Sequence, residues 1–167
     1  WSAAGVSAAQ VGDALADYID QGGKVIVNNY AYDWAGWELA GRFIDEQYGP
    51  FTKATADFTG SSHLGTVYEP GHPIMAGVTT IGNTYLWQNQ GLAAGAVRIA
   101  DWNDGHIFVA ANDNVVALNI LPSDGDGTPG WTGDLPTLYH NAIVWLATTG
   151  APALSWLTES PILSLIH

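Results

Sequence analysis

Two loops of the sequence combine residue types that can bind sugars or metal ions. The first loop, residues 29–37, follows a short β-branched run and carries two Tyr, two Trp and one Asp. Aromatic faces stack on the apolar C–H face of a sugar ring, and a nearby carboxylate accepts hydrogen bonds from its hydroxyls. We therefore predict a carbohydrate site that uses Tyr32, Asp33, Trp34 and Trp37. A structural role competes: Trp34 and Trp37 would cover the sheet core, and Asp33 would cap a helix.

The second loop, residues 122–134, is rich in Gly and Asp. Alternating carboxylates on such a loop can present several oxygens to Ca²⁺, although the complete calcium-loop pattern is absent. We predict a calcium site from Asp124, Asp126 and Asp134, and Trp131 as a further ligand-binding aromatic residue. The alternative is a solvated turn, with Asp134 placed near a helix N-terminus because its charge complements the helix dipole.

An enzymatic hypothesis uses carboxylates from both loops. Glycoside hydrolysis requires two carboxyl groups about 5–10 Å apart, and Asp33 with Asp124 or Asp126 would supply them if the loops converge. Other chemistries lack their residues. The chain has no Cys, which excludes thiolate nucleophiles and Cys-ligated metals. Its histidines do not form an H-x-x-x-H or H-E-x-x-H pair, so a catalytic zinc site is not expected.

Local patterns predict the elements that position these loops. Ser7 and Gln10 form a capping box before an apolar stripe with helical spacing, and Gly22 and Gly23 end that helix. Residues 24–28 are a β-branched run typical of a strand buried on both faces. Ligands of open parallel sheets bind beyond the carboxyl ends of strands, which is where both loops begin.

The rest of the chain predicts a mixed α/β fold. We expect a second helix over residues 37–48, a short strand near 65–68 and a closing helix over 135–148. Three strands are expected at 97–102, 106–110 and 115–120, because tight-turn sequences rich in Asn, Asp and Gly separate them. These strands would form an antiparallel meander beside one or more parallel core strands.

Composition limits the partners and the compartment. Apolar residues make up 47% and charged residues 12% of the chain, which is typical of a globular domain. A net charge of -12 would repel nucleic acid and anionic membranes, and no apolar run is long enough for membrane insertion. Few Lys and Arg with many Trp, Gly, Asn and Thr are typical of extracellular or cell-surface bacterial proteins. We expect one domain over residues 1–150 and a linker or truncated following module over 151–167.

Three segments carry a family resemblance. Residues 11–51 and the run Gly71-His72-Pro73-Ile74-Met75 with Gly77-Val78 resemble class I glutamine amidotransferase-like domains of large secreted bacterial proteins. Trp131 and Asp134 with residues 138–147 resemble the closing helix of the ThuA-like branch. The resemblance implies a partial three-layer flavodoxin-like fold whose first βα units would precede Trp1. Residues 155–161 are similar to the opening of an Ig-like module, so neighbouring domains of a parent polypeptide are implied partners.

The chain lacks the nucleophile that the active members of that family use. Active amidotransferases use a Cys nucleophile, and this sequence has neither a Cys nor a Gly-x-Ser-x-Gly substitute. Glutaminase activity is therefore excluded. The leading hypothesis is a non-catalytic extracellular module that packs against neighbours or binds carbohydrate through its aromatic loops. A carbohydrate-active hydrolase and a structural spacer without a ligand are the alternatives.

Overall fold

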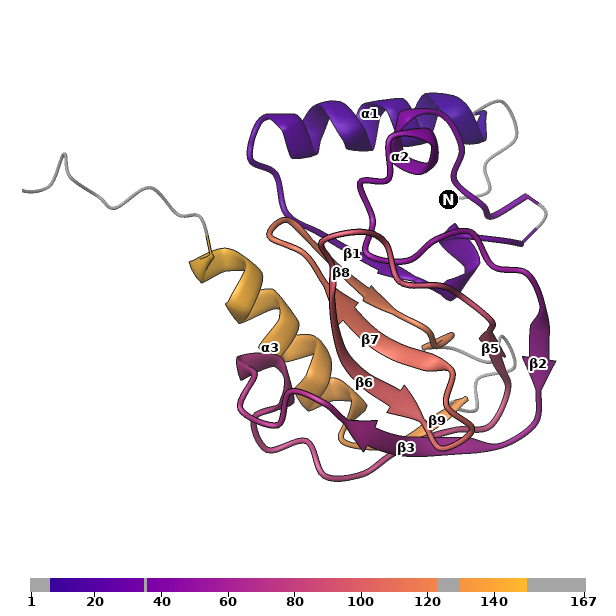
Figure 1. Cartoon of the computed structure of the whole chain (residues 1–167), viewed down its shortest axis with the longest axis vertical. Helices are drawn as coiled ribbons and strands as arrows, with labels where there is room; N and C mark the ends of the chain where they lie inside the picture. The colour runs from indigo at the N-terminus through magenta and orange to yellow at the C-terminus, as the bar shows by residue number, and fades with distance from the viewer. Residues whose placement is uncertain (1–6, 35, 123–129, 150–167) are drawn as a thin grey trace, which may run out of the picture.

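The computed structural model describes residues 7–34, 36–122 and 130–149 as a mixed α/β fold (Figure 1). A curled seven-stranded mixed sheet has the order β1-β8-β7-β6-β3-β4-β9. Its strands are β1 (Val25–Asn28), β3 (Ser62–Val67), β4 (Ile81–Asn83), β6 (Val97–Trp102), β7 (Ile107–Ala111), β8 (Val115–Leu118) and β9 (Trp131–Gly133). A separate pair contains β2 (Asp57–Thr59) and β5 (Leu86–Gln88). The helices are α1 (Ala8–Asp20), α2 (Arg42–Asp45) and α3 (Leu135–Thr148), with 3₁₀ turns η1 (Asn29–Ala31) and η2 (Pro73–Met75).

The sheet combines one parallel pair with antiparallel neighbours. Strand β1 runs parallel to β8, with Val25 beside Val115, whereas the other paired strands of the large sheet are antiparallel. The predicted α/β class, the β6–β7–β8 meander and the closing helix are therefore confirmed. The three-layer flavodoxin-like arrangement stays a prediction.

Helix α1 begins and ends where its sequence signals place it. The Ser7 hydroxyl accepts a hydrogen bond from the Gln10 amide at 3.1 Å, and the Gln10 side chain accepts one from the Ser7 amide at 3.3 Å. Gly22, with a φ of 87°, lies just past the end of the helix. At Gly12, a Cβ atom would lie 1.8 Å from the Ala40 carbonyl oxygen. The absence of a side chain at Gly12 therefore allows the loop that precedes α2 to pack closely on α1.

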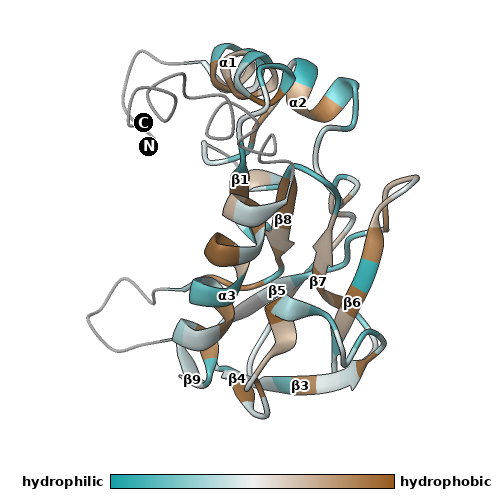
Figure 2. Ribbon diagram, turned by 90° about the vertical axis from the view of Figure 1, so that its left-hand side faces the viewer, coloured by the Kyte–Doolittle hydropathy of each residue, from teal (hydrophilic) through white to brown (hydrophobic). Residues whose placement is uncertain are grey.

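Two apolar clusters hold the helices on the sheet. Residues of α3, including Leu138 and Leu146, pack with Val116 and Leu118 of β8. Residues of α1 and α2 pack in the second cluster with Val115 and other sheet residues. Because alternate side chains of β8 enter different clusters, the strand contributes to both sides of the core. Figure 2 shows the apolar colouring of β8 and its place between α3 and the α1–α2 pair.

The predicted helix over residues 37–48 is wrong, since only Arg42–Asp45 form a helical turn. Gly41 precedes that turn with a φ of 62°, a conformation outside the right-handed helical region. The Asp13 carboxylate accepts a hydrogen bond from the Arg42 amide at 2.8 Å and so ties the start of α2 to α1. Consequently Gly41, and not Asp33, occupies the N-cap position of this helix.

Candidate functional site

Four aromatic residues from two separate segments gather near the carboxyl end of β1, and we call them the aromatic surface: Tyr30, Trp34, Trp37 and Tyr85. The rings of Tyr30 and Trp34 stack with centroids 4.7 Å apart and planes inclined by 13°. Trp37 lies against the same tyrosine with a centroid distance of 6.5 Å. Trp37 and Tyr85 are 42% and 40% exposed, so this surface offers aromatic rings to solvent.

The backbone of the loop explains why these rings come together. The Trp34 carbonyl accepts hydrogen bonds from the amides of Trp37 at 2.7 Å and Glu38 at 2.9 Å, which closes a turn. The Leu39 amide then donates to the Ala31 carbonyl at 2.8 Å, so the chain returns beside η1. The turn thereby holds both indoles within contact distance of one tyrosine ring.

A cleft of about 750 Å³ adjoins the aromatic surface. Tyr30, Trp37 and Tyr85 line it, together with mostly aliphatic residues from α1, β1 and the segment that follows β8. The cleft thus lies at the carboxyl end of β1 and at the edge with which no described strand pairs, beside the only parallel pair among the described strands. Open parallel sheets hold ligands beyond the carboxyl ends of their strands, a position that only the β1–β8 pair offers among the described strands.

Tyr30 of this surface is a neutral hydrogen-bonding group. Burial raises the pKa of Tyr30, and a side-chain hydrogen bond with Tyr85 and the negative charge of Asp57 raise it further. The phenol of Tyr30 therefore keeps its proton at physiological pH. It remains both a donor and an acceptor beside the exposed rings.

Two carboxylates flank the aromatic surface. The Gln88 side-chain amide donates to the Asp33 carbonyl at 2.6 Å and to Asp57 Oδ1 at 2.8 Å, so it links the loop to β2. The Asp33 carboxylate is 43% exposed and lies 4.0 Å from Lys53 Nζ. Both acids can therefore accept hydrogen bonds from a ligand beside the rings.

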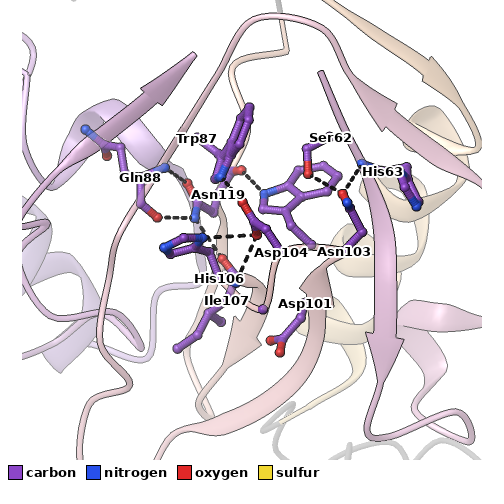
Figure 3. A network of polar contacts seen from close by, with 12 residues as sticks. Ser62, His63, Trp87, Gln88, Asp101, Asn103, Asp104, His106, Ile107 and Asn119 are labelled. Carbon is purple, nitrogen blue, oxygen red and sulfur yellow. Dashed lines mark hydrogen bonds and ion pairs between the residues drawn. The ribbon is translucent and has the colours of Figure 1, made fainter. Parts of the chain in front are cut away.

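A buried asparagine fixes β5, the strand that follows Tyr85 (Figure 3). The Asn119 side chain accepts a hydrogen bond from the Gln88 amide at 2.8 Å and donates to the Gln88 carbonyl at 2.7 Å. It also donates to the Ile107 carbonyl at 2.8 Å, while the Trp102 indole donates to the Asn119 carbonyl at 2.9 Å. This network attaches β5 to the large sheet. This network was not predicted from the sequence, although a polar residue inside an apolar strand run was a usable signal.

Asp104 forms a second polar centre in the β6–β7 turn (Figure 3). It accepts hydrogen bonds from the Trp87 indole at 2.7 Å and the His106 amide at 3.1 Å. His106 Nδ1 lies 3.0 Å from its carboxylate, without the alignment of a hydrogen bond. Burial alone would raise the pKa of Asp104, but the contacts with His106 and Trp87 outweigh burial and lower it.

The lowered pKa of Asp104 predicts a pH-dependent contribution to stability. A carboxyl group whose pKa is lower when folded stabilises the fold while ionised, so this contribution is lost as the pH falls through the folded pKa. The difference in unfolding free energy between the natural chain and Asp104→Asn should be constant above about pH 5 and shrink below about pH 4. Urea unfolding at a series of pH values measures it. An unchanged difference at pH 3 would contradict the role given to this carboxylate.

Two of the aromatic residues predicted to bind a ligand lie elsewhere. Tyr32 is only 1% exposed and packs against Phe43 and Phe51 in the core, with ring centroids 6.4 and 5.5 Å away. Trp131 begins β9, at the opposite edge of the sheet from β1, and packs partly buried against the cluster that contains α3. The structure therefore brings Trp34 and Trp37 together with Asp33, but not with Tyr32 or Trp131.

The predicted acidic site is described only in part. Asp134 accepts hydrogen bonds from the backbone amides of Thr79 and Thr80, both at 2.9 Å, and these bonds lower its pKa. Asp124 and Asp126 lie outside the described residues, so the calcium site and the paired-carboxylate hydrolase stay predictions. Within the described part of the chain, no group of three or more His, Cys, Asp or Glu side chains is arranged to hold a metal ion.

Comparisons with protein-family models, curated proteins and solved structures find no match for this chain. None of these comparisons supports the amidotransferase-like resemblance. In residues 7–34, 36–122 and 130–149, no helix has the length and apolar character needed to cross a membrane. The function must be inferred from the geometry of the site.

Proposed function

We propose that this chain is a non-catalytic module of a larger extracellular protein and that it binds carbohydrate through the aromatic surface. One observation carries the proposal: exposed aromatic rings from two distant segments meet beside two accessible carboxylates. An exposed indole next to a stacked Tyr–Trp pair is costly to leave in water without a partner, and such clusters mark binding surfaces.

The contacts suit a sugar ring. Trp37 presents an exposed face for the apolar C–H side of the sugar, and Tyr30 with Tyr85 supply hydroxyls. Asp33 and Asp57 accept hydrogen bonds from sugar hydroxyls at the margin of the rings. The stacked Tyr30–Trp34 pair keeps this arrangement in place before the ligand arrives, which lowers the entropy cost of binding.

The absence of a thiol supports a binding role over the amidotransferase reaction. We propose that the scaffold is a partial flavodoxin-like domain of amidotransferase-like type, with its ligand moved to the aromatic loop. The parallel β1–β8 pair, with α1 and α3 in separate apolar clusters, supports this relation. A calcium ion at the loop that contains Asp124 and Asp126 is part of the same proposal and would act structurally.

Affinity electrophoresis in gels that contain polysaccharides tests sugar binding. The double variant Trp34→Ala/Trp37→Ala should bind the retaining polysaccharide about tenfold more weakly, because two aromatic contacts together supply about 1–3 kcal/mol. Tyr18→Ala is the matched control, since Tyr18 is 53% exposed on α1, outside the aromatic surface, and its loss should leave retention unchanged.

Two results would refute the sugar-binding role. One is the lack of retention of the natural chain on every member of a broad glycan panel. The other is equal retention of the natural chain and the double variant. A circular dichroism spectrum of each variant confirms that the fold is kept in both comparisons.

A further inference from the structure

Carboxylates border the aromatic surface on the sides of two of its rings. Glu38 Oε2 accepts a hydrogen bond from the Trp37 amide at 3.2 Å, so its charge lies beside the residue that carries the exposed indole. Asp57, at the start of β2, lies close enough for its negative charge to act on the Tyr30 phenol. The rings therefore lie in a negative local field, in addition to the charge of Asp33.

Most of this negative charge has no cation beside it. Lys53 Nζ lies 4.0 Å from the Asp33 carboxylate and partly offsets that charge. Among the described residues, no Lys, Arg or His nitrogen forms an ion pair with Asp57 or Glu38. The whole chain has 16 Asp and Glu against 4 Lys and Arg. A cation in solution is therefore attracted to this surface, and an anion is repelled.

The rings add to this preference for positive charge. The face of an aromatic ring is negative, and an ammonium within about 6 Å of the ring centre is attracted to it, most strongly by Trp. Trp37 and Tyr85 are exposed, so an ammonium can reach them from solvent. Because Glu38 lies next to Trp37, one bound ammonium can contact a ring face while it is attracted to a carboxylate.

We propose that the ligand of the aromatic surface is an amino sugar with a free, protonated amine, such as a glucosamine oligomer. This inference rests on the proposed carbohydrate function and names its substrate class. The apolar side of the sugar stacks on Trp37, and the ammonium is attracted to Glu38 and Asp57. A neutral or N-acetylated sugar lacks the positive charge, so it keeps the stacking contact and loses the attraction.

Isothermal titration calorimetry with three trisaccharides tests this charge preference. A glucosamine trisaccharide, its N-acetylated form and cellotriose have the same linkage and differ in the group at one carbon of each ring. At about pH 6, where an alkyl amine is protonated, the glucosamine trisaccharide should bind about tenfold more tightly than the other two. The preference should shrink in about 1 M salt, because salt screens exposed charges.

Asp57→Asn tests whether the preference arises at this surface. Asp57 Oδ1 accepts a hydrogen bond from the Gln88 side chain at 2.8 Å, and the side-chain oxygen of asparagine can accept the same bond. The substitution therefore removes the charge and keeps the contact. The preference for the glucosamine trisaccharide should fall from about tenfold to about threefold. A circular dichroism spectrum checks that the fold is kept.

Asp113→Asn is the matched control for this variant. It removes the same charge from an exposed residue of the β7–β8 turn. That turn lies near the amino end of β1, since Val25 lies beside Val115, whereas the aromatic surface lies near the carboxyl end. The control should keep the full preference for the glucosamine trisaccharide.

The possible results separate this inference from the carbohydrate proposal. Equal affinity for the three trisaccharides overturns the amino-sugar inference and leaves the carbohydrate proposal standing. Lack of binding to all three also overturns the inference, and the glycan panel then decides the carbohydrate proposal. A tri-lysine peptide with a capped amino terminus has the same charge without a sugar ring. If it binds as tightly as the glucosamine trisaccharide, or if both Asn variants lose the preference equally, the attraction is nonspecific and the inference is overturned.

Discussion

Replacing Asn119 with alanine should lower the free energy of unfolding by about 4 kcal/mol. The side chain is fully buried and satisfies three backbone groups, the Gln88 amide, the Gln88 carbonyl and the Ile107 carbonyl. Each buried group left without a partner costs about 1–3 kcal/mol. Since domains of this size are stable by only about 5–15 kcal/mol, the variant should unfold at a much lower urea concentration.

Asn89→Ala is the control for this prediction. Asn89 is exposed and its side chain donates to the Thr55 hydroxyl at 2.9 Å, so its loss should cost no more than about 0.5 kcal/mol. Urea unfolding curves of both variants give the comparison. A loss below about 1 kcal/mol for Asn119→Ala would mean that this asparagine does not hold β5 on the sheet.

Replacing Arg98 with methionine should lower the unfolding free energy by about 3–5 kcal/mol, because it leaves a buried carboxylate without its cation. The Asp101 side chain is only 2% exposed and accepts a hydrogen bond from Arg98 Nε at 2.7 Å. The Tyr68 hydroxyl donates to the same carboxylate at 2.9 Å. This single neutral hydrogen bond stabilises the charge too weakly to replace a guanidinium.

A second substitution shows whether the charge is the cause. Adding Asp101→Asn to Arg98→Met removes the uncompensated charge and should recover part of the lost stability. Thermal unfolding of the two single variants and the double variant measures this coupling. Equal instability of Arg98→Met and the double variant would assign the loss to packing of the arginine stem instead.

The sequence predicts best those elements whose signals are local. The capping box at Ser7 gives the start of α1, and the turn sequences at residues 103–105 and 112–114 separate β6, β7 and β8. Helix α3 has the predicted bounds of 135–148. Each of these signals acts within a few residues, so it does not depend on the rest of the fold.

Residues 37–48 do not form the expected long helix, because tertiary contacts override their helical sequence pattern. Gly12 lets the Ala40 carbonyl approach α1, and the Asp13 carboxylate binds the amide that follows Gly41. Both contacts involve residues that are far apart in the sequence. Propensity and periodicity carry no information about such contacts.

The candidate site was predicted in its location and in part of its residues. Trp34, Trp37 and Asp33 follow β1 as expected, but Tyr32 points into the core while Tyr30 joins the surface. Tyr85 was missed because it comes from a distant segment. Its backbone amide donates to Asn83 Oδ1 and its carbonyl accepts from the Gly60 amide, contacts that only the folded chain assembles.

Tryptophan indole N–H signals in an NMR titration test the carbohydrate proposal most directly. The titrant is the oligosaccharide of whichever polysaccharide retains the chain. The indole signals of Trp34 and Trp37 should shift and saturate together, while that of Trp102, buried and bonded to the Asn119 carbonyl, should stay in place. Saturable binding that leaves Trp34 and Trp37 unmoved would contradict a ligand site at the aromatic surface.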